Sequence, residues 1–481
     1  MTRRDDRLAD LGLFAAVLLG YLSARSAFFN FDGVACAVAV ELSDFKHLVH
    51  SNHLAYGLVS WAFTGLWRAL GYAGDALYPM QVLNGLLGAA GAAATARLLR
   101  RLGAPGREAA LGAAALSVSY AWWMWSLEAQ VYMLGALPLI LAFTEALAER
   151  PRPWAVGLLH AASMLGHSGH CVAAPALAYL LWHARRERRD LAAYFGAAAS
   201  AVVVSYAAAV LAFVRPATGA ELRLWLLGSM ALGQSRTFEW HLGPSVLDGL
   251  RGWGQTTLRV FCDFTRVSGA MKALGLALAV LPLAAAARAF QRPAREDKAL
   301  GLWLAGHALI YSTWEPFTIV YRVSDLPALW ALAWRGLDAA DAPPKARAVG
   351  LAVWAAVAGL YNWRASIAAD CDPRNNAEYQ ETLAVAAATP PDAWVAAHAR
   401  NQVYYPFFGG RRPLNLRYYG TPEALAARVA QLEARGEAVY ATGRTLKEFP
   451  GLAAGLRVEK LDGDLLRLRA AASRKAAAGR D

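Results

Sequence analysis

Charged residues and cysteines are both scarce in this sequence. Only 17% of the 481 residues are Asp, Glu, Lys or Arg, whereas a soluble protein of ordinary composition carries about 25%. The four cysteines have no paired spacing, which argues against a zinc site or a disulfide framework. The sequence also shows no internal repeat, and its last quarter has neither a Gly-rich phosphate loop nor a catalytic triad signature. An ordinary soluble domain is therefore a poor description of most of this chain.

Apolar residues make up 57% of the chain, and they gather in long runs over its first three quarters. Runs of this length are typical of helices that cross a bilayer. The formal net charge of +12 comes from Lys and Arg in short clusters between these runs, which is how cytoplasmic loops are marked. We therefore predict a polytopic α-helical membrane protein and interpret the positive charge as topology, with no nucleic-acid partner.

The N-terminal arginines set the orientation of the first apolar run. Arg3, Arg4 and Arg7 precede a run at about 9–27, so the N-terminus is expected in the cytoplasm and Asp32 outside. No convincing cleavage site follows, and we interpret this run as a retained signal anchor.

Two apolar runs separate Asp32 from the next basic cluster, RLLRRLGAPGR at 97–107, but only one crossing fits between them. The run at about 54–72 is interrupted by Trp67 and Arg68 and ends in a Gly-rich stretch. We assign it to the outer surface, within a set of juxtamembrane helices at about 28–75.

With this choice the spans and the basic clusters alternate consistently. We expect about eleven transmembrane helices, at about 9–27, 76–96, 108–125, 130–147, 154–167, 170–184, 191–214, 268–290, 299–314, 317–335 and 347–364. An outer segment at 215–266 joins the seventh and eighth spans. The predicted domains are a transmembrane domain, 1–365, and a C-terminal domain, 366–481, which the odd number of crossings places outside.

The C-terminal domain has a mixed pattern. VYYPFF and EAVYATG resemble strands, whereas TPEALAARVAQLEARG resembles a helix, so we expect a small soluble α/β domain. By itself it is typical of a lid or a docking module.

This topology gathers polar residues on the outer side. They are Asp32, Glu41, Asp44, His47, His50, His53, Tyr56, Glu128, Tyr132, His167, His170, Arg266, Lys272, Glu315 and Arg322. Ionisable residues at membrane depth are costly and usually functional.

Structural interpretations stay open beside the functional ones. Asp32 is either the N-cap of a helix that begins at Gly33, a functional acid, or both. Asp44, His47 and His50 are either a metal-ligand set or solvated histidines beside an acid. Arg322 and Asp325 are either a structural ion pair or part of an anion site.

Transfer of a group from a lipid phosphate would use these residue types. A carboxylate near the membrane surface serves as general base for the incoming nucleophile. A cation holds the leaving phosphate and stabilises its developing charge.

The order of these features resembles the GT-C class of membrane glycosyltransferases. The resemblance rests on F-x-x-D-G at 29–33 after the first span, H-x-x-Y at 53–56, the span ending RLLRRLG, and the next span leading to Glu128. It covers about residues 9–365 in layout and is strongest over 9–135. The H-P-P or K-P-P motif of the class is absent, and so is the W-W-D-x-G motif of its oligosaccharyltransferase branch.

The resemblance implies an inverting glycosyltransferase in a bacterial inner membrane, with a periplasmic C-terminal domain. It implies a polyprenyl-phosphate sugar donor, membrane lipid as a partner, and a glycan, lipid or protein acceptor. Asp32 and Glu128 match the catalytic acids of the class, and Arg322 matches its phosphate-binding residue by position. We add Arg266 and Lys272 as donor-phosphate contacts, and His53, Tyr56, Tyr132, His167, His170 and Glu315 as substrate contacts. No cofactor is expected, with a divalent metal as the lesser alternative.

Two other classes of function stay open. One is a transporter or flippase for a lipid-linked or anionic solute, with Arg322 and Asp325 along its pathway. The other is a non-catalytic membrane scaffold whose C-terminal domain binds partners.

Overall fold

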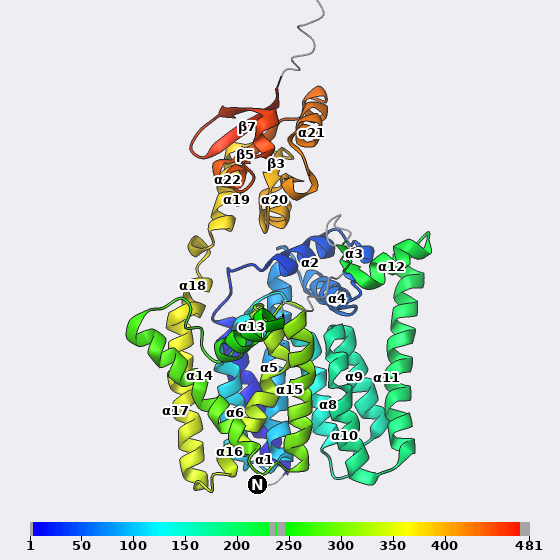
Figure 1. The fold of residues 1–481 in the computed structure, drawn as a ribbon, viewed down its shortest axis with the longest axis vertical. Coiled ribbons are helices and arrows are strands. Elements are labelled where there is room, and N and C mark those ends of the chain that lie inside the picture. The colour runs from blue at the N-terminus through cyan, green and yellow to red at the C-terminus, as the bar shows by residue number, and fades with distance from the viewer. Residues whose placement is uncertain (1–2, 230–235, 238–245, 472–481) are drawn as a thin grey trace, which may run out of the picture. The chain divides into compact units, whose positions relative to one another are not determined.

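The chain is mostly helical and forms two compact units (Figure 1). A computed structural model describes residues 3–229, 236–237 and 246–471. The helical unit comprises the residues up to Ser26 together with Ala39–Cys371, and the α/β unit comprises Ala27–Val38 with the residues from Asp372 onward. The α/β unit thus resumes six residues after the expected start of the C-terminal domain, and residues 27–38, which were expected in the transmembrane domain, belong to the α/β unit. Each unit is described by itself.

The helical unit begins with α1 and continues through a series of helices of very different length. Its elements as far as the middle of the chain are α1 (Arg3–Leu22), α3 (Phe45–Leu48), α4 (Tyr56–Ala69), α5 (Leu77–Arg101), α6 (Gly106–Val118), α7 (Tyr120–Leu127), α8 (Tyr132–Ala146), α9 (Pro153–Gly166), η1 (Ser168–Ala173), α10 (Ala174–Arg185), α11 (Arg188–Ala209) and η2 (Val210–Val214). The remaining elements are α12 (Gly219–Leu227), the paired β1 (Gly228–Ser229) and β2 (Arg236–Thr237), α13 (Val246–Arg259), α14 (Gly269–Ala289), α15 (Arg295–Thr313), η4 (Ile319–Ser324), α16 (Leu326–Asp338), α17 (Pro344–Asn362), η5 (Trp363–Ile367) and α18 (Ala368–Asp370).

Each expected span coincides with one helix or with two consecutive ones. The third span is divided at Ser119 into α6 and α7, and the sixth and tenth begin as the short 3₁₀ helices η1 and η4. Within the described residues, three helices are long and apolar enough to cross a membrane: Leu77–Arg101, Arg188–Val214 and Gly269–Ala289. The number eleven and the orientation therefore stay predictions. Residues 230–235 and 238–245 of the expected outer segment lie outside the described residues.

Small residues explain how the helices of this unit approach one another. In α5, a Cβ atom at Gly91 would lie 2.5 Å from the Trp122 ring, and one at Gly88 would lie 2.1 Å from Ser126 Oγ. Glycine at these two positions lets α7 pack directly against α5, as is common between membrane helices. The packing places the end of α7, where Glu128 follows, beside α5.

The apolar run at 54–72 folds as α4, as expected, and ends at Gly71 in the left-handed conformation, with φ of +94°. Its buried residues Tyr56, Gly57, Ser60 and Thr64 follow helical spacing, while Trp61 and Leu66 are exposed. One face of α4 therefore packs on the unit and the other presents apolar side chains. Its position at the outer surface stays a prediction.

The α/β unit contains a five-stranded sheet, which confirms the expected small domain. After α2 (Phe31–Glu41), whose last residues belong to the helical unit, its elements are η6 (Pro373–Asn375), α19 (Ala377–Ala388), β3 (Trp394–Ala397), α20 (Asn401–Gly409), β4 (Arg412–Asn415), η7 (Leu416–Tyr418), α21 (Pro422–Ala434), β5 (Val439–Thr442), α22 (Gly443–Glu448), η8 (Leu452–Gly455), β6 (Leu456–Lys460) and β7 (Leu465–Ala470). The strand order is β4-β3-β5-β7-β6, with β3 parallel to both neighbours and β7 antiparallel to both of its own.

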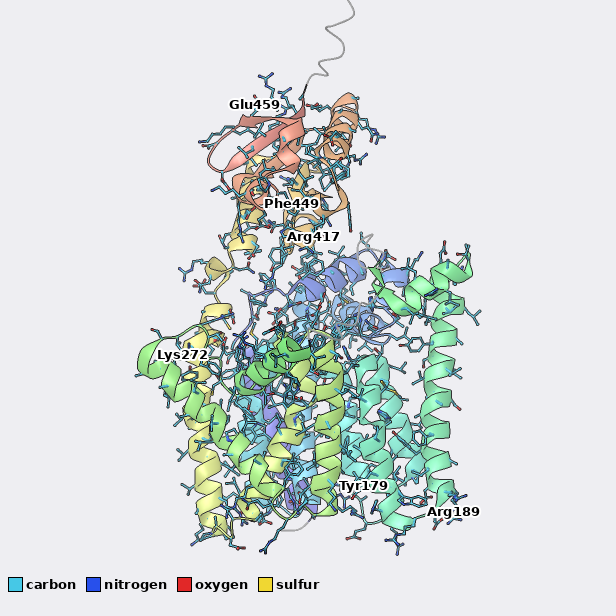
Figure 2. All side chains as sticks on the ribbon, in the orientation of Figure 1. Tyr179, Arg189, Lys272, Arg417, Phe449 and Glu459 are labelled. Atoms are coloured by element: carbon cyan, nitrogen blue, oxygen red, sulfur yellow. The ribbon has the colours of Figure 1, made fainter. Side chains whose placement is uncertain are left out.

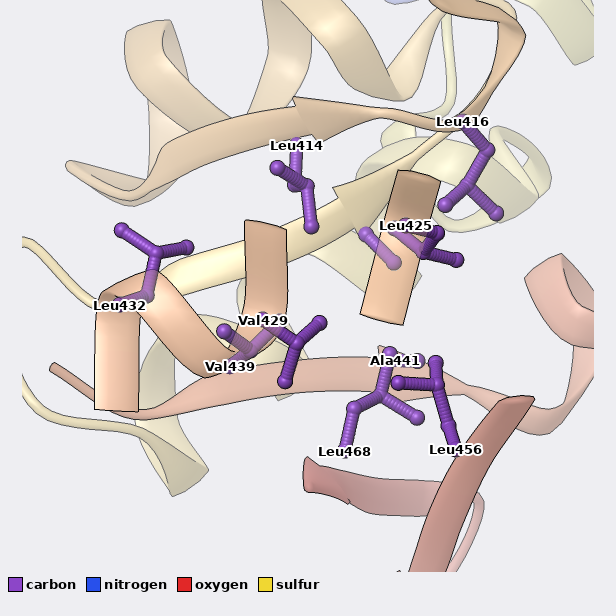
Figure 3. Packing of buried hydrophobic residues seen from close by; sticks show 10 residues of the cluster. Leu414, Leu416, Leu425, Val429, Leu432, Val439, Ala441, Leu456 and Leu468 are labelled. Carbon is purple, nitrogen blue, oxygen red and sulfur yellow. The ribbon is translucent and has the colours of Figure 1, made fainter. Parts of the chain in front are cut away.

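The core of this unit forms between the sheet and α21 (Figure 3). Leu425, Val429 and Leu432 follow one another at helical spacing and are fully buried. Thr421 caps the helix by accepting a hydrogen bond from the Ala424 amide. The helix predicted from TPEALAARVAQLEARG and the strand predicted from EAVYATG are both confirmed.

The strand expected from VYYPFF is wrong, because these residues lie in α20. Tyr404 and Phe408 are one helical turn apart, and their rings pack at 5.3 Å. Gly410 then ends the helix in the left-handed conformation, with φ of +59°. Aromatic residues favour strands in isolation, but here their packing on one helix face decides the structure.

Candidate functional site

Glu128 is buried at the end of α7 and is held by hydrogen bonds from distant parts of the helical unit. It is 1% exposed. Its side chain accepts a hydrogen bond from Ser26 Oγ, and Asn84 Nδ2 donates to its backbone oxygen. Asn84 also donates to the Gln130 carbonyl at 2.6 Å, and Gln81 donates to the Ser26 carbonyl at 2.9 Å. A buried carboxylate requires such partners because desolvation is costly.

Tyr132, His167 and His170, three of the predicted substrate contacts, lie together. The Tyr132 and His167 ring centroids are 5.0 Å apart, and those of His167 and His170 are 5.6 Å apart. The His170 ring also lies 2.8 Å from Ser324 Oγ, which joins η1 to η4. Tyr321 of η4 packs edge-on against Tyr132 at 5.5 Å. These residues form an aromatic and histidine cluster, hereafter the His167 cluster.

The loop that carries His53 is bonded to the loop that carries His167. The Ser168 amide donates to the Asn52 carbonyl at 2.7 Å, and the Ala55 amide donates to the Leu165 carbonyl at 2.9 Å. His53 stacks on His50 at 4.3 Å. Burial lowers the pKa of His50 to about 4 and lowers the pKa of His53 well below its ordinary value, so both imidazoles are neutral at pH 7. Tyr56 is buried in the first turn of α4.

Glu315 is exposed and is connected to the His167 cluster through Tyr321. Its carboxylate accepts hydrogen bonds from Thr318 Oγ1 at 3.1 Å and from the Tyr321 hydroxyl at 3.4 Å. The Tyr321 ring is stacked on Tyr311 at 4.8 Å. Tyr132, His167 and His170 are buried, so Glu315 and the half-buried Tyr321 are the members of this group that reach the surface.

Arg322 forms the ion pair with Asp325 that the sequence suggested as one alternative. Both side chains are almost fully buried, with 2% and 0% exposed. Arg322 Nε donates to Asp325 Oδ2 at 2.9 Å, and Nη1 donates to Thr257 Oγ1 at 2.6 Å. The guanidinium also lies 4.8 Å from the Trp253 ring. The anion-binding role of Arg322 stays a prediction.

Helix α13 supplies Trp253 and Thr257, and the sequence reasoning missed both. The signal that could have found them is the helical spacing of apolar residues over 246–259, a stretch assigned as a whole to the long outer segment.

The two other predicted phosphate contacts, Arg266 and Lys272, differ in their surroundings. Arg266 Nη1 contacts Asp370 at 2.6 Å, and its Nε lies 3.6 Å from Asp263. Lys272 is exposed on α14 (Figure 2). Arg266 is thus partly neutralised by carboxylates, whereas Lys272 lies at the surface.

Asp32 belongs to the α/β unit and is exposed in the first turn of α2. The interpretation of Asp32 as the N-cap of a helix beginning at Gly33 is wrong, because the helix begins at Phe31. Asn30 Oδ1 accepts a hydrogen bond from the Asp32 amide at 3.0 Å and so performs the capping. Asn30 therefore occupies the capping position, and Asp32 lies in the first turn of α2.

The proposed metal-ligand set does not converge on one point. Asp44 Oδ2 lies 2.6 Å from His47 Nδ1, while His50 stacks on His53 instead. In the part of the chain that the structure describes, no group of three or more His, Cys, Asp or Glu side chains is placed to hold a metal ion.

Comparisons with known proteins identify the fold. No protein family model matches the sequence, and no curated protein matches it. Among solved structures, ArnT from Cupriavidus metallidurans bound to undecaprenyl phosphate is similar with a TM-score of 0.64 and 13% identity, covering 98% of this chain and 99% of that chain. ArnT in the apo state gives a TM-score of 0.66 and 13% identity over 95% and 97% of the two chains.

A third similar structure is the arabinofuranosyltransferase AftD from Mycobacteria, with a TM-score of 0.52 and 17% identity. The match covers 98% of this chain and 40% of that chain. The structural neighbours are GT-C glycosyltransferases, and this chain has the GT-C fold. At these identities the likeness establishes the architecture, and the activity has to be argued from the residues.

Proposed function

We propose that this chain is an inverting glycosyltransferase that moves a sugar from a polyprenyl-phosphate donor to an acceptor at the outer face of a bacterial inner membrane. The observation that carries the proposal is the fold match to ArnT with bound undecaprenyl phosphate, which spans 98% of this chain and 99% of the other. A match over nearly both full lengths includes the membrane domain and the C-terminal domain, so it is not a likeness of a few helices.

In this proposal Asp32 is the general base. Its carboxylate takes the proton from an acceptor hydroxyl, whose oxygen forms a bond to the anomeric carbon of the sugar. The bond between that carbon and the phosphate oxygen breaks, and polyprenyl phosphate leaves with the electron pair. One displacement at the anomeric carbon inverts its configuration. The exposure of the Asp32 side chain, in the first turn of α2, supports this assignment.

The other residues bind and orient the reactants. Glu128 is the second acid, and its buried hydrogen bonds hold it in one orientation, as an acid that contacts substrate requires. Arg322, Arg266 and Lys272 are the cations for the donor phosphate. Arg322 would share its guanidinium between Asp325 and the phosphate. His53, Tyr56, Glu315 and the residues of the His167 cluster are the proposed contacts for sugar and acceptor.

The experiment is transfer of labelled sugar from polyprenyl-phosphate donors by the purified protein in nanodiscs. Asp32→Asn keeps the size and loses the base, so we expect kcat to fall about 10²- to 10⁴-fold. Asp462→Asn changes an exposed acid elsewhere in the α/β unit and should leave kcat unchanged. Wild-type turnover in a folded Asp32→Asn protein would remove Asp32 from the mechanism, and absence of transfer from every polyprenyl-phosphate donor by the wild type would refute the activity.

A further inference from the structure

The backbone that leads into Asp32 is held by side chains of the C-terminal domain. Asn376 Nδ2 donates to the carbonyl oxygens of Ala27 and Phe28, at 2.9 and 3.0 Å. The Tyr404 hydroxyl lies 3.1 Å from the Phe28 carbonyl oxygen and 2.5 Å from that of Phe29. Three consecutive carbonyl groups of the loop are therefore bonded to two residues that follow them by 348 to 376 positions in the sequence.

Side-chain packing adds to these bonds. The Phe29 ring packs on Tyr379 at 5.2 Å and on Phe408 at 5.0 Å, and it is 8% exposed. The Arg400 guanidinium lies 4.1 Å from the centroid of the Phe28 ring. This packing explains why residues 27–38 group with the C-terminal domain in one compact unit.

Phe29 has a backbone conformation that needs such support. Its φ is +47°, in the left-handed region that a bulky residue rarely adopts. Residues in this region persist where their surroundings hold them, and they concentrate at functional sites. The turn at Phe29 leads directly into Asn30. The Asn30 side chain caps the start of α2 by accepting a hydrogen bond from the Asp32 amide. The conformation of Phe29 therefore sets the direction in which α2, and Asp32 with it, begins.

We propose that the C-terminal domain positions the general base, with Asn376 and Tyr404 as positioning residues. They fix the carbonyl groups of residues 27–29 and so keep Asp32 at the orientation that proton abstraction needs. This inference rests on the proposed role of Asp32. It gives the C-terminal domain a direct part in the reaction, in place of the lid or docking role suggested by its sequence pattern.

Asn376 has a second function that a test must leave intact. Its Oδ1 accepts a hydrogen bond from the Tyr379 amide at 3.0 Å and caps α19, while its Nδ2 holds the loop. Asn376→Ser keeps a good capping oxygen and removes the amide donor. Tyr404→Phe keeps the ring against Phe408 and removes the hydroxyl.

The next residue along α20 supplies a matched control. Tyr405 is as buried as Tyr404, but its hydroxyl lies 3.3 Å from Glu381 and 3.4 Å from Asn401, both within the C-terminal domain. Tyr405→Phe thus removes a buried hydroxyl from the same helix without touching the loop.

The first measurement is steady-state sugar transfer by the full-length protein in nanodiscs. Asn376→Ser and Tyr404→Phe should lower kcat about 10- to 100-fold with the donor KM unchanged, since a small misplacement of a catalytic group has effects of this size. Tyr405→Phe should retain the wild-type kcat. In the Asp32→Asn background, Tyr404→Phe should cause no further loss, because a residue that acts only through Asp32 has nothing left to position.

The second measurement needs no substrate. Amide hydrogen exchange at Asp32 and Val34 should be faster in Asn376→Ser and Tyr404→Phe than in the wild type, and unchanged in Tyr405→Phe. Unchanged exchange in all three variants would overturn the holding of the loop. If exchange is faster but kcat is unchanged in Asn376→Ser and Tyr404→Phe, while Asp32→Asn inactivates the protein, only the positioning role is overturned. Wild-type turnover in Asp32→Asn would refute the base assignment and the positioning role together, while the exchange rates still report whether the loop is held.

Discussion

Among the described residues, the helical unit has ion pairs with an almost fully buried carboxylate, beside exposed pairs such as Arg68–Glu41, whereas every ion pair of the α/β unit has a partly exposed carboxylate. In the helical unit, Arg322 and Asp325 have 2% and 0% of their side chains exposed. In the α/β unit, Arg412 and Glu437 are exposed by 46% and 31%, and the interior beneath the sheet is apolar (Figure 3). Removing one partner of a buried pair leaves an uncompensated charge, whereas an exposed partner is solvated. The helical unit should therefore be most sensitive to loss of polar contacts, and the α/β unit to cavities.

The largest effect is expected in the helical unit, from substitution of Glu128, and it is a loss of activity. Glu128→Gln keeps the size of the side chain and an oxygen for the Ser26 hydroxyl, but it loses the charge. We expect kcat to fall about 10²- to 10³-fold, as for loss of a catalytic acid or base, with the melting temperature changed little. Glu423→Gln, at an exposed position on α21, is the control. Full turnover in Glu128→Gln would show that Glu128 and its hydrogen bonds have a structural role only.

The buried ion pair comes next, and a double substitution separates its two interpretations. Arg322→Met leaves Asp325 buried without its partner and should cost about 3–5 kcal/mol of unfolding free energy, measured by thermal unfolding in nanodiscs. Arg322→Met combined with Asp325→Leu replaces the pair by apolar groups and should recover most of that stability. If Arg322 also binds the donor phosphate, the stable double variant will still show a raised donor KM. A wild-type KM in that variant would make the pair purely structural.

The sequence predicted the helices better than it predicted the contacts between them. Long apolar runs mark spans such as α5 and α11 because bilayer thickness sets a minimum length. Strand propensity failed at VYYPFF, where the i,i+4 packing of Tyr404 on Phe408 decides for a helix. Tyr132, His167 and His170, which the predicted topology places on one side, contact one another because the start of α8, the end of α9 and η1 meet. Their role as substrate contacts stays a prediction.

The contacts that hold the two acids were beyond sequence reasoning for a physical reason. Asn84 and Asn376 both donate to backbone carbonyl groups, and every residue has a carbonyl, so the partner's identity leaves no pattern in the sequence. The separation between Asn376 and Ala27 is 349 residues, which also removes any local spacing signal. The same reasoning explains why the first outer loop was assigned to the membrane domain.

The α/β unit should be sensitive to a cavity in its apolar core, as the helical unit is to the loss of a buried ion pair. Leu425→Ala empties a fully buried position beneath the sheet, and about 2–5 kcal/mol of unfolding free energy should be lost. Leu461→Ala, at a position 39% exposed, is the matched control and should cost much less. Amide hydrogen exchange along β5 in the full-length protein measures the difference. Equal exchange in the two variants would contradict an apolar core that carries the stability of this unit.

Because His50 is neutral when buried, we predict that the stability of the helical unit depends on pH. Burial, assisted by the nearby His47, lowers the pKa of His50 in the folded state to about 4 from its ordinary value of 6.5. The unfolded chain then binds more protons between these values, so stability is lost as pH falls from 6.5 towards 4. We expect His50 to contribute about 1–3 kcal/mol of this loss. This is less than the full pKa shift would correspond to, because the ring is partly exposed to solvent.

The measurement is the melting temperature in nanodiscs across this pH range. His50→Gln should flatten the dependence in part, since His53 contributes in the same direction. His183→Gln, at an exposed position on α10, should leave the curve as in the wild type. An unchanged slope in His50→Gln would show that His50 is solvated in the folded protein.

The smallest effect is expected from the exposed pair of the α/β unit. Glu437→Gln removes the charge that faces Arg412 but keeps an oxygen for the Trp394 indole, which donates to Glu437 at 3.2 Å. The cost should be at most about 1 kcal/mol, and it should vanish at about 1 M salt, where the screening length is about 3 Å. Hydrogen exchange along β3 and β5 at low and high salt measures it. A cost as large as that of Arg322→Met, or one that salt does not reduce, would mean that the contrast in charge burial between the two units does not govern their stability.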